Sequence, residues 1–240
     1  MSVFFIAGTD TEVGKTFISC ALLERAGFDG LATAAIKPIA AGCQLTAEGW
    51  QNEDAILLKQ CMNEPRSYPE VNPIALQSAI APHIAALEEK ISLTANDIAS
   101  MCQRLIKPST DLTLIEGAGG WRVPLNDSET LADVVKLLNI PVILVVGMKL
   151  GCLNHALLTA EAIQSDCLRL AGWVANTIDP DMSRFQENVD TLKRILNTPC
   201  LGVVPYLGAS KAIQSSHPTT AISAPLTMLA AQYLSLTGIV

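Results

Sequence analysis

Short apolar runs rich in β-branched residues alternate along the chain with longer segments whose apolar positions have helical spacing. Six runs are typical of buried parallel strands, at residues 3–7, 31–36, 112–115, 142–146, 170–175 and 201–204. Helices are predicted between them, at residues 16–26, 53–62, 94–106, 131–138, 154–165 and 183–196. This alternation predicts an α/β fold, a doubly wound and mostly parallel sheet flanked by helices. Ligands bind such sheets beyond the carboxyl ends of the strands.

Two segments depart from the alternation. Residues 63–93 are rich in proline and lack strong periodicity, so we expect a long excursion with a short helix near 83–88. This excursion could lie over the active site. Residues 207–225 are rich in Ser, Thr, Ala and Pro and predict a loop before a terminal helix at 225–236.

Composition narrows the class of protein. Half of the 240 residues are hydrophobic, enough for one large core, and we expect a single α/β domain over residues 1–240, with 207–240 the least constrained part. The net charge of -7 and the lack of a basic cluster argue against nucleic acid as a partner. The longest apolar run, 141–148, is too short to span a bilayer, and residue 1 begins a strand rather than an export signal. We therefore expect no membrane association.

The seven cysteines are odd in number, scattered, and never form a Cys-x-x-Cys pair. This pattern argues against a disulfide framework or a zinc site. We expect buried thiols in a reducing cytoplasm.

Candidate chemistry begins with Gly-Thr-Asp-Thr-Glu-Val-Gly-Lys-Thr at residues 8–16, between the first predicted strand and helix. Glycines let backbone N–H groups curl around phosphate oxygens, Lys15 can reach the terminal phosphates, and the Thr16 hydroxyl can ligate Mg²⁺. The motif predicts a P-loop nucleoside triphosphate-binding fold. Five residues separate Gly8 from Gly14, where the common motif has four, and Thr9 stands where its first glycine would fall.

Oxygen-bearing side chains suited to a nucleotide-bound Mg²⁺ are Thr16, Asp54 and Glu116. Glu116 stands at the carboxyl end of a predicted buried strand, where P-loop proteins place an acid that faces the metal. Asp54 has two interpretations on sequence alone, a metal ligand or only a helix cap.

Lys37 ends a predicted strand and precedes a proline, which favours extended backbone and keeps a helix from starting there. Its ammonium group can point into the cleft and neutralise a transferring phosphoryl group or an anionic substrate. The alternative, of equal weight on sequence alone, is a strand-end lysine whose ammonium reaches solvent.

Other signals are weaker. The glycine run at 117–120 can let backbone approach a ligand, but such runs are common. Asn154 could cap a helix whose first N–H groups hold a carboxylate, although an ordinary helix start is as good an interpretation. His83 and His155 lack partners at metal-ligand spacing, and we assign neither to catalysis.

Several motifs together resemble the dethiobiotin synthetase family, from the N-terminus to about residue 207. They are the loop at 8–16, the Lys-Pro pair at 37–38, Glu-Gly-Ala-Gly-Gly-Trp at 116–121, the strand at 141–147, Lys-Leu-Gly-Cys-Leu-Asn-His-Ala at 149–156 and Ala-Gly-Trp-Val-Ala-Asn at 171–176. The resemblance implies an ATP- and Mg²⁺-dependent ligase of biotin biosynthesis. Its substrates would be diaminopelargonic acid and carbon dioxide, joined through a phosphorylated carbamate before the ureido ring closes. A homodimer with the substrate site at its interface is also implied.

The resemblance further implies roles for individual residues. The catalytic residues would be Lys37, Lys15 and Thr11, and the Mg²⁺ ligands Thr16, Asp54 and Glu116. Nucleotide contacts are implied for Glu12, Val13, Gly14, Lys15, Thr16, Phe17, Asp54, Glu116, Gly117, Ala118, Gly119, Asn176, Thr177, Pro205, Tyr206 and Leu207. Substrate contacts are implied for Thr11, Lys37, Ala41, Gly151, Cys152 and Asn154, the last three from the other subunit.

Two positions depart from the family pattern. Ala41 stands where the family commonly offers a hydroxyl to the substrate, and Thr177 where an acidic residue is often found. Loss of the hydroxyl would either weaken or relocate one hydrogen bond to the substrate, worth about 1 kcal/mol.

Rival functions also fit a P-loop fold. Membrane-cycling or partitioning ATPases carry a second lysine five residues before the P-loop lysine, a position held here by Asp10. Amidoligase relatives usually append a glutaminase domain, for which the chain has no room. A regulatory subunit without catalysis would lack a catalytic lysine or a metal-binding acid, and neither is missing here.

Overall fold

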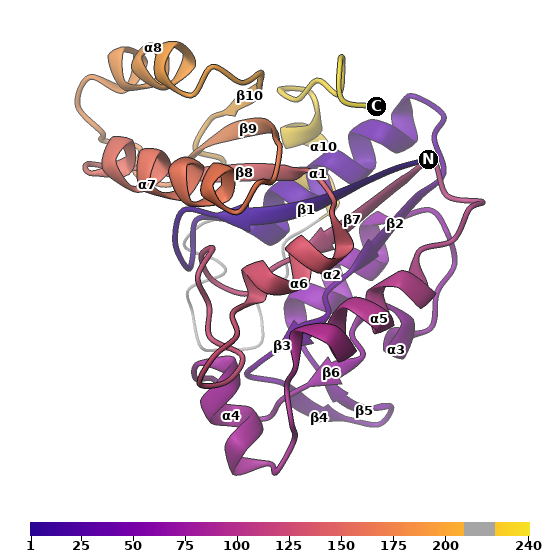
Figure 1. The fold of residues 1–240 in the computed structure, drawn as a ribbon. Helices are drawn as coiled ribbons and strands as arrows, with labels where there is room; N and C mark the ends of the chain where they lie inside the picture. Colours follow the sequence, from indigo (N-terminus) through magenta and orange to yellow (C-terminus); the bar gives the residue numbers. More distant parts are fainter. Residues whose placement is uncertain (209–223) are drawn as a thin grey trace.

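The computed structural model describes residues 1–208 and 224–240 of the chain. At its centre lies a six-stranded sheet whose pairings are all parallel (Figure 1). Its strands are β1 (Ser2–Gly8), β2 (Thr33–Ile36), β7 (Leu112–Glu116), β8 (Val142–Met148), β9 (Leu170–Thr177) and β10 (Cys200–Val204), in the order β10-β9-β8-β1-β7-β2. The six predicted strands and the predicted doubly wound fold are confirmed.

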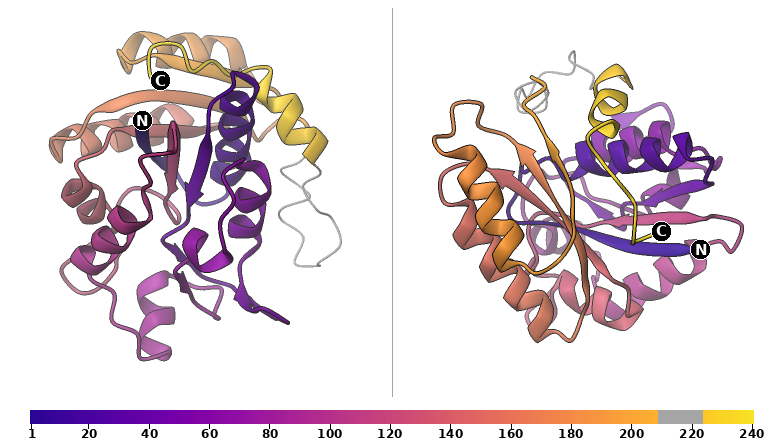
Figure 2. Two further views of the ribbon diagram at one scale, coloured as in Figure 1. Left: turned by 90° about the vertical axis from the view of Figure 1, so that its right-hand side faces the viewer. Right: turned by 90° about the horizontal axis from the view of Figure 1, so that it is seen from above.

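Helices cover both faces of the sheet (Figure 2). One face carries α1 (Lys15–Phe28), α2 (Glu53–Cys61) and α10 (Ala224–Ala231). The opposite face carries α5 (Ala95–Leu105), α6 (Leu131–Leu138), α7 (Cys152–Ser165) and α8 (Phe185–Ile195). The six helices predicted between strands occur in the structure, and neither end of any of them is shifted by more than two residues.

The period of two along each strand divides the core into two clusters. In β1, Phe4 and Ile6 pack beneath α1 and α2, whereas Phe5 and Ala7 pack on the opposite face with α5 and α6. Because both faces are covered, the strand is apolar at every central position rather than at alternate ones. This is why continuous apolar runs were a reliable signal.

The part of the chain between β2 and β7, which includes the excursion predicted at 63–93, is more ordered than the sequence predicts. It contains two small sheets, β3 (Ile39–Ala40) with β6 (Ile74–Ala75) and the hairpin of β4 (Gln44–Thr46) and β5 (Gly49–Gln51). It also contains α3 (Tyr68–Val71) and α4 (Pro82–Glu88), of which only α4 was expected. Strands of two or three residues are too short to show a period, so pattern cannot detect them.

The C-terminal segment protects an edge of the sheet. The helix predicted at 225–236 ends at Ala231, because the chain then turns back to β10. Leu234 forms an antiparallel bridge with Gly202, and the Ser235 N–H donates to the Leu201 carbonyl at 2.8 Å. These contacts occupy backbone groups that an edge strand would otherwise expose. Most of the loop predicted at 207–225 lies outside the described residues.

The cysteines are less uniformly buried than expected. Four of the seven are buried, Cys61 and Cys200 are partly exposed, and Cys167 is exposed, so the prediction of buried thiols is wrong for Cys167. Cys167 lies just beyond the end of α7, in a turn with positive φ that faces solvent. None of the seven forms a disulfide. Within the described ranges, no helix is long and apolar enough to cross a membrane.

Candidate active site

The loop after β1 enters α1 through two residues with left-handed backbone. Glu12 has a φ of 59°, and Gly14, the N-cap of α1, has a φ of 85°. Glycine adopts this conformation without strain, and a side chain at position 14 would also collide with the Asn176 amide. The first amides of α1 have no partner within the helix, so this end of the helix suits an anion.

Val13 holds the loop in place from the side away from the cavity. Its side chain is buried against two glycines, since a Cβ on Gly8 or Gly147 would lie 2.8 Å from a Val13 methyl. Its carbonyl accepts a hydrogen bond of 2.9 Å from Asn176 Nδ2. Val13 itself does not line the cavity described below, so any nucleotide contact from it would come from its backbone N–H.

Lys15 and Thr16 follow as the first residues of α1, and both are buried. Lys15 Nζ donates to the Asp10 carbonyl at 3.2 Å and so folds back over the loop. Burial, and next the charge of Lys37, lower the pKa of Lys15 to about 8. A bound phosphate would raise this pKa again, because an opposite charge favours the ammonium form.

Lys37 does not reach solvent, so that interpretation is wrong. The residue is 4% exposed, and Nζ donates to Glu116 Oε1 at 2.6 Å, to Asp54 Oδ2 at 3.0 Å and to the Gly117 carbonyl at 3.3 Å. Burial favours the neutral amine, but the two carboxylates outweigh burial and hold the pKa of Lys37 above its usual value. The ammonium group thus links the ends of β2, β7 and α2.

Asp54 is free to act in the cavity because another residue caps its helix. Asn52 is the N-cap of α2, and its side chain accepts from the Asp54 and Ala55 N–H groups. The Asp54 carboxylate faces Lys37 instead. Of the two interpretations, the helix cap is therefore excluded.

The oxygen atoms at and around Glu116 are of the kind that ligates Mg²⁺ bound to a nucleotide. Thr16 Oγ1 donates to Glu116 Oε1 at 2.8 Å, while Glu116 Oε2 is buried and has no hydrogen-bond partner among the described residues. Mg²⁺ is usually held by one or two carboxylates together with substrate phosphates and water. The described residues contain no cluster of three or more His, Cys, Asp or Glu that could hold a metal alone. Thr16, Asp54 and Glu116 match such a partial ligand set.

These residues open onto a cavity of about 670 Å³. Predicted site residues that line it are Thr11, Glu12, Gly14, Lys15, Thr16, Phe17, Lys37, Ala41, Asp54, Ala118, Gly119, Asn176, Thr177, Pro205 and Leu207. Glu116 and Gly117 lie directly behind this wall, where they contact Lys37. Tyr206 does not line it, although both of its neighbours do.

The segment after β8 stands apart from this cavity. Helix α7 begins at Cys152, with Gly151 as N-cap at a φ of 94°, so the prediction that Asn154 caps the helix is wrong. Gly151 takes this role because glycine adopts the left-handed turn freely. Asn154 is exposed and Cys152 buried, and neither they nor Gly151 line the cavity of this chain. Their role towards a second copy stays a prediction.

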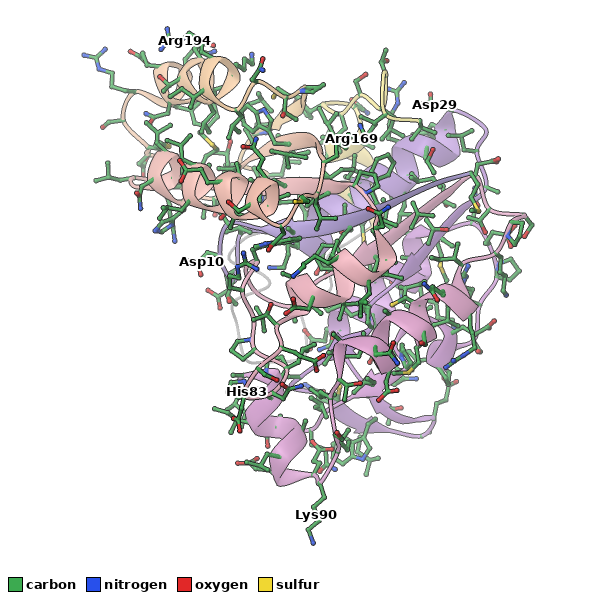
Figure 3. All side chains as sticks on the ribbon, in the orientation of Figure 1. Asp10, Asp29, His83, Lys90, Arg169 and Arg194 are labelled. Carbon is green, nitrogen blue, oxygen red and sulfur yellow. The ribbon has the colours of Figure 1, made fainter. Side chains whose placement is uncertain are left out.

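Part of the cavity wall was missed by sequence reasoning. It comes from the segment that enters α4, Ala79 to Pro82, and from Arg122 to Pro124 after the second glycine loop. Figure 3 shows Asp10, on the loop after β1, and His83, on α4, towards the same side of the molecule. The proline-rich character of 63–93 hinted at the first segment. Arg122 carried no signal, since its position depends on an ion pair of 2.8 Å with Asp166 at the end of α7.

Comparison with known proteins places the chain among its relatives. A family model described as an AAA domain matches residues 2–214. ATP-dependent dethiobiotin synthetase BioD of Cellvibrio japonicus is 54% identical over 213 residues, which cover 89% of this chain and 93% of that protein. The protein of the same name from Pseudomonas aeruginosa strain UCBPP-PA14 is 52% identical over 219 residues, 90% of this chain and 96% of that protein.

Solved structures agree on the fold. The MinC:MinD cell division protein complex of Aquifex aeolicus superposes with a TM-score of 0.55 over 97% of this chain and 94% of that one, at 14% identity. At that identity the likeness concerns the fold alone. With more than half of the aligned residues identical to two enzymes over at least 89% of its length, the chain belongs to the family of ATP-dependent dethiobiotin synthetases.

Proposed function

We propose that this cavity binds ATP and diaminopelargonic acid together, and that it forms dethiobiotin from the acid and carbon dioxide. The observation that carries the proposal is the position of Lys37, buried between Asp54 and Glu116 and lining the same cavity as the phosphate loop. A cation held there faces the region in which a phosphoryl group would pass to an anionic acceptor.

The nucleotide would occupy the side of the cavity formed by α1 and β9. Its phosphates would lie on the loop and the first amides of α1, with Lys15 on the terminal phosphates. Asn176, Thr177 and the Pro205 loop line the same cavity and would contact the base. Thr16, Asp54 and Glu116 would hold Mg²⁺, which supplies charge neutralisation on the β- and γ-phosphate oxygens.

The acid would lie along the apolar wall. Ile80, Pro82 and Val123 line the cavity and suit a methylene chain, while Thr11 and Lys37 offer polar contacts to the reacting end. Ala41 also lines the cavity but has no hydroxyl to donate. The carboxylate at the far end of the acid would reach Gly151, Cys152 and Asn154 of a second subunit, so a homodimer is part of the proposal.

The chemistry would proceed in three steps. One substrate amine adds to carbon dioxide, releases a proton to solvent and becomes a carbamate, whose negative charge Lys37 stabilises. The carbamate oxygen attacks the γ-phosphorus, ADP leaves, and a carbamic-phosphoric anhydride results. The neighbouring amine then attacks the carbonyl carbon, phosphate leaves with the proton of that amine, and the ureido ring closes. The residues position the reactants and neutralise the negative charge on them, and no base that activates water is needed.

A cytoplasmic location is also part of the proposal. Seven unpaired cysteines support it, because free thiols persist in a reducing compartment.

One assay tests the activity. The protein is incubated with ATP, Mg²⁺, bicarbonate and diaminopelargonic acid, and dethiobiotin and ADP are quantified by mass spectrometry. We expect one ADP for each dethiobiotin, and no ADP without the acid. ATP hydrolysis that proceeds without any ureido product would overturn the proposal. Turnover that persists after EDTA treatment would overturn the metal assignment alone.

A further inference from the structure

The end of β9 is joined to the phosphate loop by one side chain. Asn176 is 5% exposed, and its amide lies 2.9 Å from the carbonyl oxygen of Val13, which is 163 positions away in sequence. A carbonyl can only accept a hydrogen bond, so the Nδ2 group of Asn176 must face it. Oδ1 has no donor among the described residues, and Asn176 lines the cavity.

The residue that Asn176 holds is itself fixed on its other side. The Val13 side chain fills a recess between Gly8 on β1 and Gly147 on β8. Val13 stands between the two left-handed residues of the loop, Glu12 and Gly14. The carbonyl bond and the packed side chain together determine where this segment lies, and Gly14 leads directly to Lys15.

The same strand end reaches the far side of the cavity. Thr177 Oγ1 donates to the Val204 carbonyl at 2.7 Å, and Val204 precedes the Pro205 loop that lines the cavity. Hydrogen bonds therefore run from the phosphate loop through β9 to the end of β10. No other side chain of β9 makes a side-chain hydrogen bond to the phosphate loop among the described residues.

We propose that Asn176 is a positioning residue that holds the phosphate loop in its binding conformation through Val13. The inference rests on the proposed nucleotide site and goes beyond a contact with the base. Without the amide, the buried Val13 carbonyl would lose its partner, and the loop would have to order itself when phosphate binds. Binding of the phosphates alone should then weaken, whether or not a base is present.

A ligand without a base separates this role from base recognition. Inorganic tripolyphosphate with Mg²⁺ is titrated into the full-length protein by calorimetry, in parallel with ATP and Mg²⁺. We expect Asn176→Ala to weaken tripolyphosphate binding by about tenfold, and ATP binding by at least as much, because a buried carbonyl has lost its donor. Asn188→Ala is the matched control, since Asn188 does not line the cavity and its Nδ2 donates to the carbonyl of Arg184, the N-cap of α8, at 2.7 Å.

The outcomes are distinct. Unchanged tripolyphosphate affinity together with weakened ATP affinity would overturn the positioning role and leave only a base contact. Unchanged affinity for both ligands would remove Asn176 from the site. If Asn176→Ala does not fold, Asn176→Leu keeps a side chain of similar size without a donor or a charge, and the same loss is expected. A wild-type protein that binds neither ligand would instead contradict the proposed nucleotide site.

Discussion

At the scale of single residues, Lys37 shows how one buried side chain can pair with two acids, the buried Glu116 and the partly exposed Asp54. Glu116 has no exposed side-chain surface, and a charge so placed is costly without a partner. Lys37 supplies that partner and also lines the cavity, so its charge serves stability and chemistry at once. The sequence showed only a lysine at a strand end and could not decide between cleft and solvent.

Replacement of this lysine tests its role directly. Lys37→Ala should lower kcat/KM for dethiobiotin formation by at least about tenfold, because a fixed charge beside the transferring group is lost. ATP binding should persist, since Lys15 and the loop amides remain. Steady-state kinetics and calorimetry provide the two measurements. Lys136→Ala, at an exposed lysine of α6, should change neither, and unchanged turnover in Lys37→Ala would refute the assignment.

At the scale of elements, short α3 supports the start of α2. Glu70 and Ser67 form a capping box, and Lys107 Nζ lies 3.0 Å from the other Glu70 oxygen. On the same helix, the Tyr68 hydroxyl accepts from the Asn52 N–H at 2.7 Å, and Asn52 caps the helix that carries Asp54. An element that sequence reasoning missed thus stands directly behind a proposed metal ligand.

Acid titration tests this cap. The Ser67 N–H, and next Lys107, lower the pKa of Glu70 from 4.5 to about 2. Its carboxylate therefore stabilises the fold above pH 4.5, and this contribution is lost as the pH falls towards 2. Wild type should have a higher urea midpoint than Glu70→Gln at pH 7, and the gap should narrow below pH 4.5. Glu161→Gln, at an exposed position of α7, is the control; a gap that stays constant with pH would contradict the cap.

At the scale of the whole molecule, the segment at 149–154 contributes no residue to the cavity wall of its own chain. Leu150 in that segment is 94% exposed. Such a side chain suits an interface with a second copy, which would also bring Gly151 and Cys152 to a substrate held by the partner.

Oligomeric state tests this arrangement. Light scattering should give a mass about twice the 25.5 kDa of one chain. Leu150→Glu should shift the mass towards one chain and raise KM for diaminopelargonic acid, while ATP binding stays unchanged. Leu45→Glu, at a leucine of the β4 hairpin that is 69% exposed, is the control. A wild-type monomer with full activity would exclude the shared site.

The sequence by itself determined the sheet, most helices and the chemistry of the phosphate loop. These features depend on local patterns, because burial on both faces makes each central strand continuously apolar and the loop motif lies within nine consecutive residues. Lys37 and Glu116 were identified for the same reason, since both stand directly after such strands.

Only the tertiary structure decided how these pieces meet. It brought Lys37 between Asp54 and Glu116, set Asn176 against Val13, and placed Arg122 in the cavity wall through Asp166. It also showed that Gly151 rather than Asn154 begins α7. Each of these features depends on contacts between residues distant in sequence or on backbone conformation. Long-range contacts and backbone conformation produce no periodic pattern of apolar and polar residues, so the sequence alone does not reveal them.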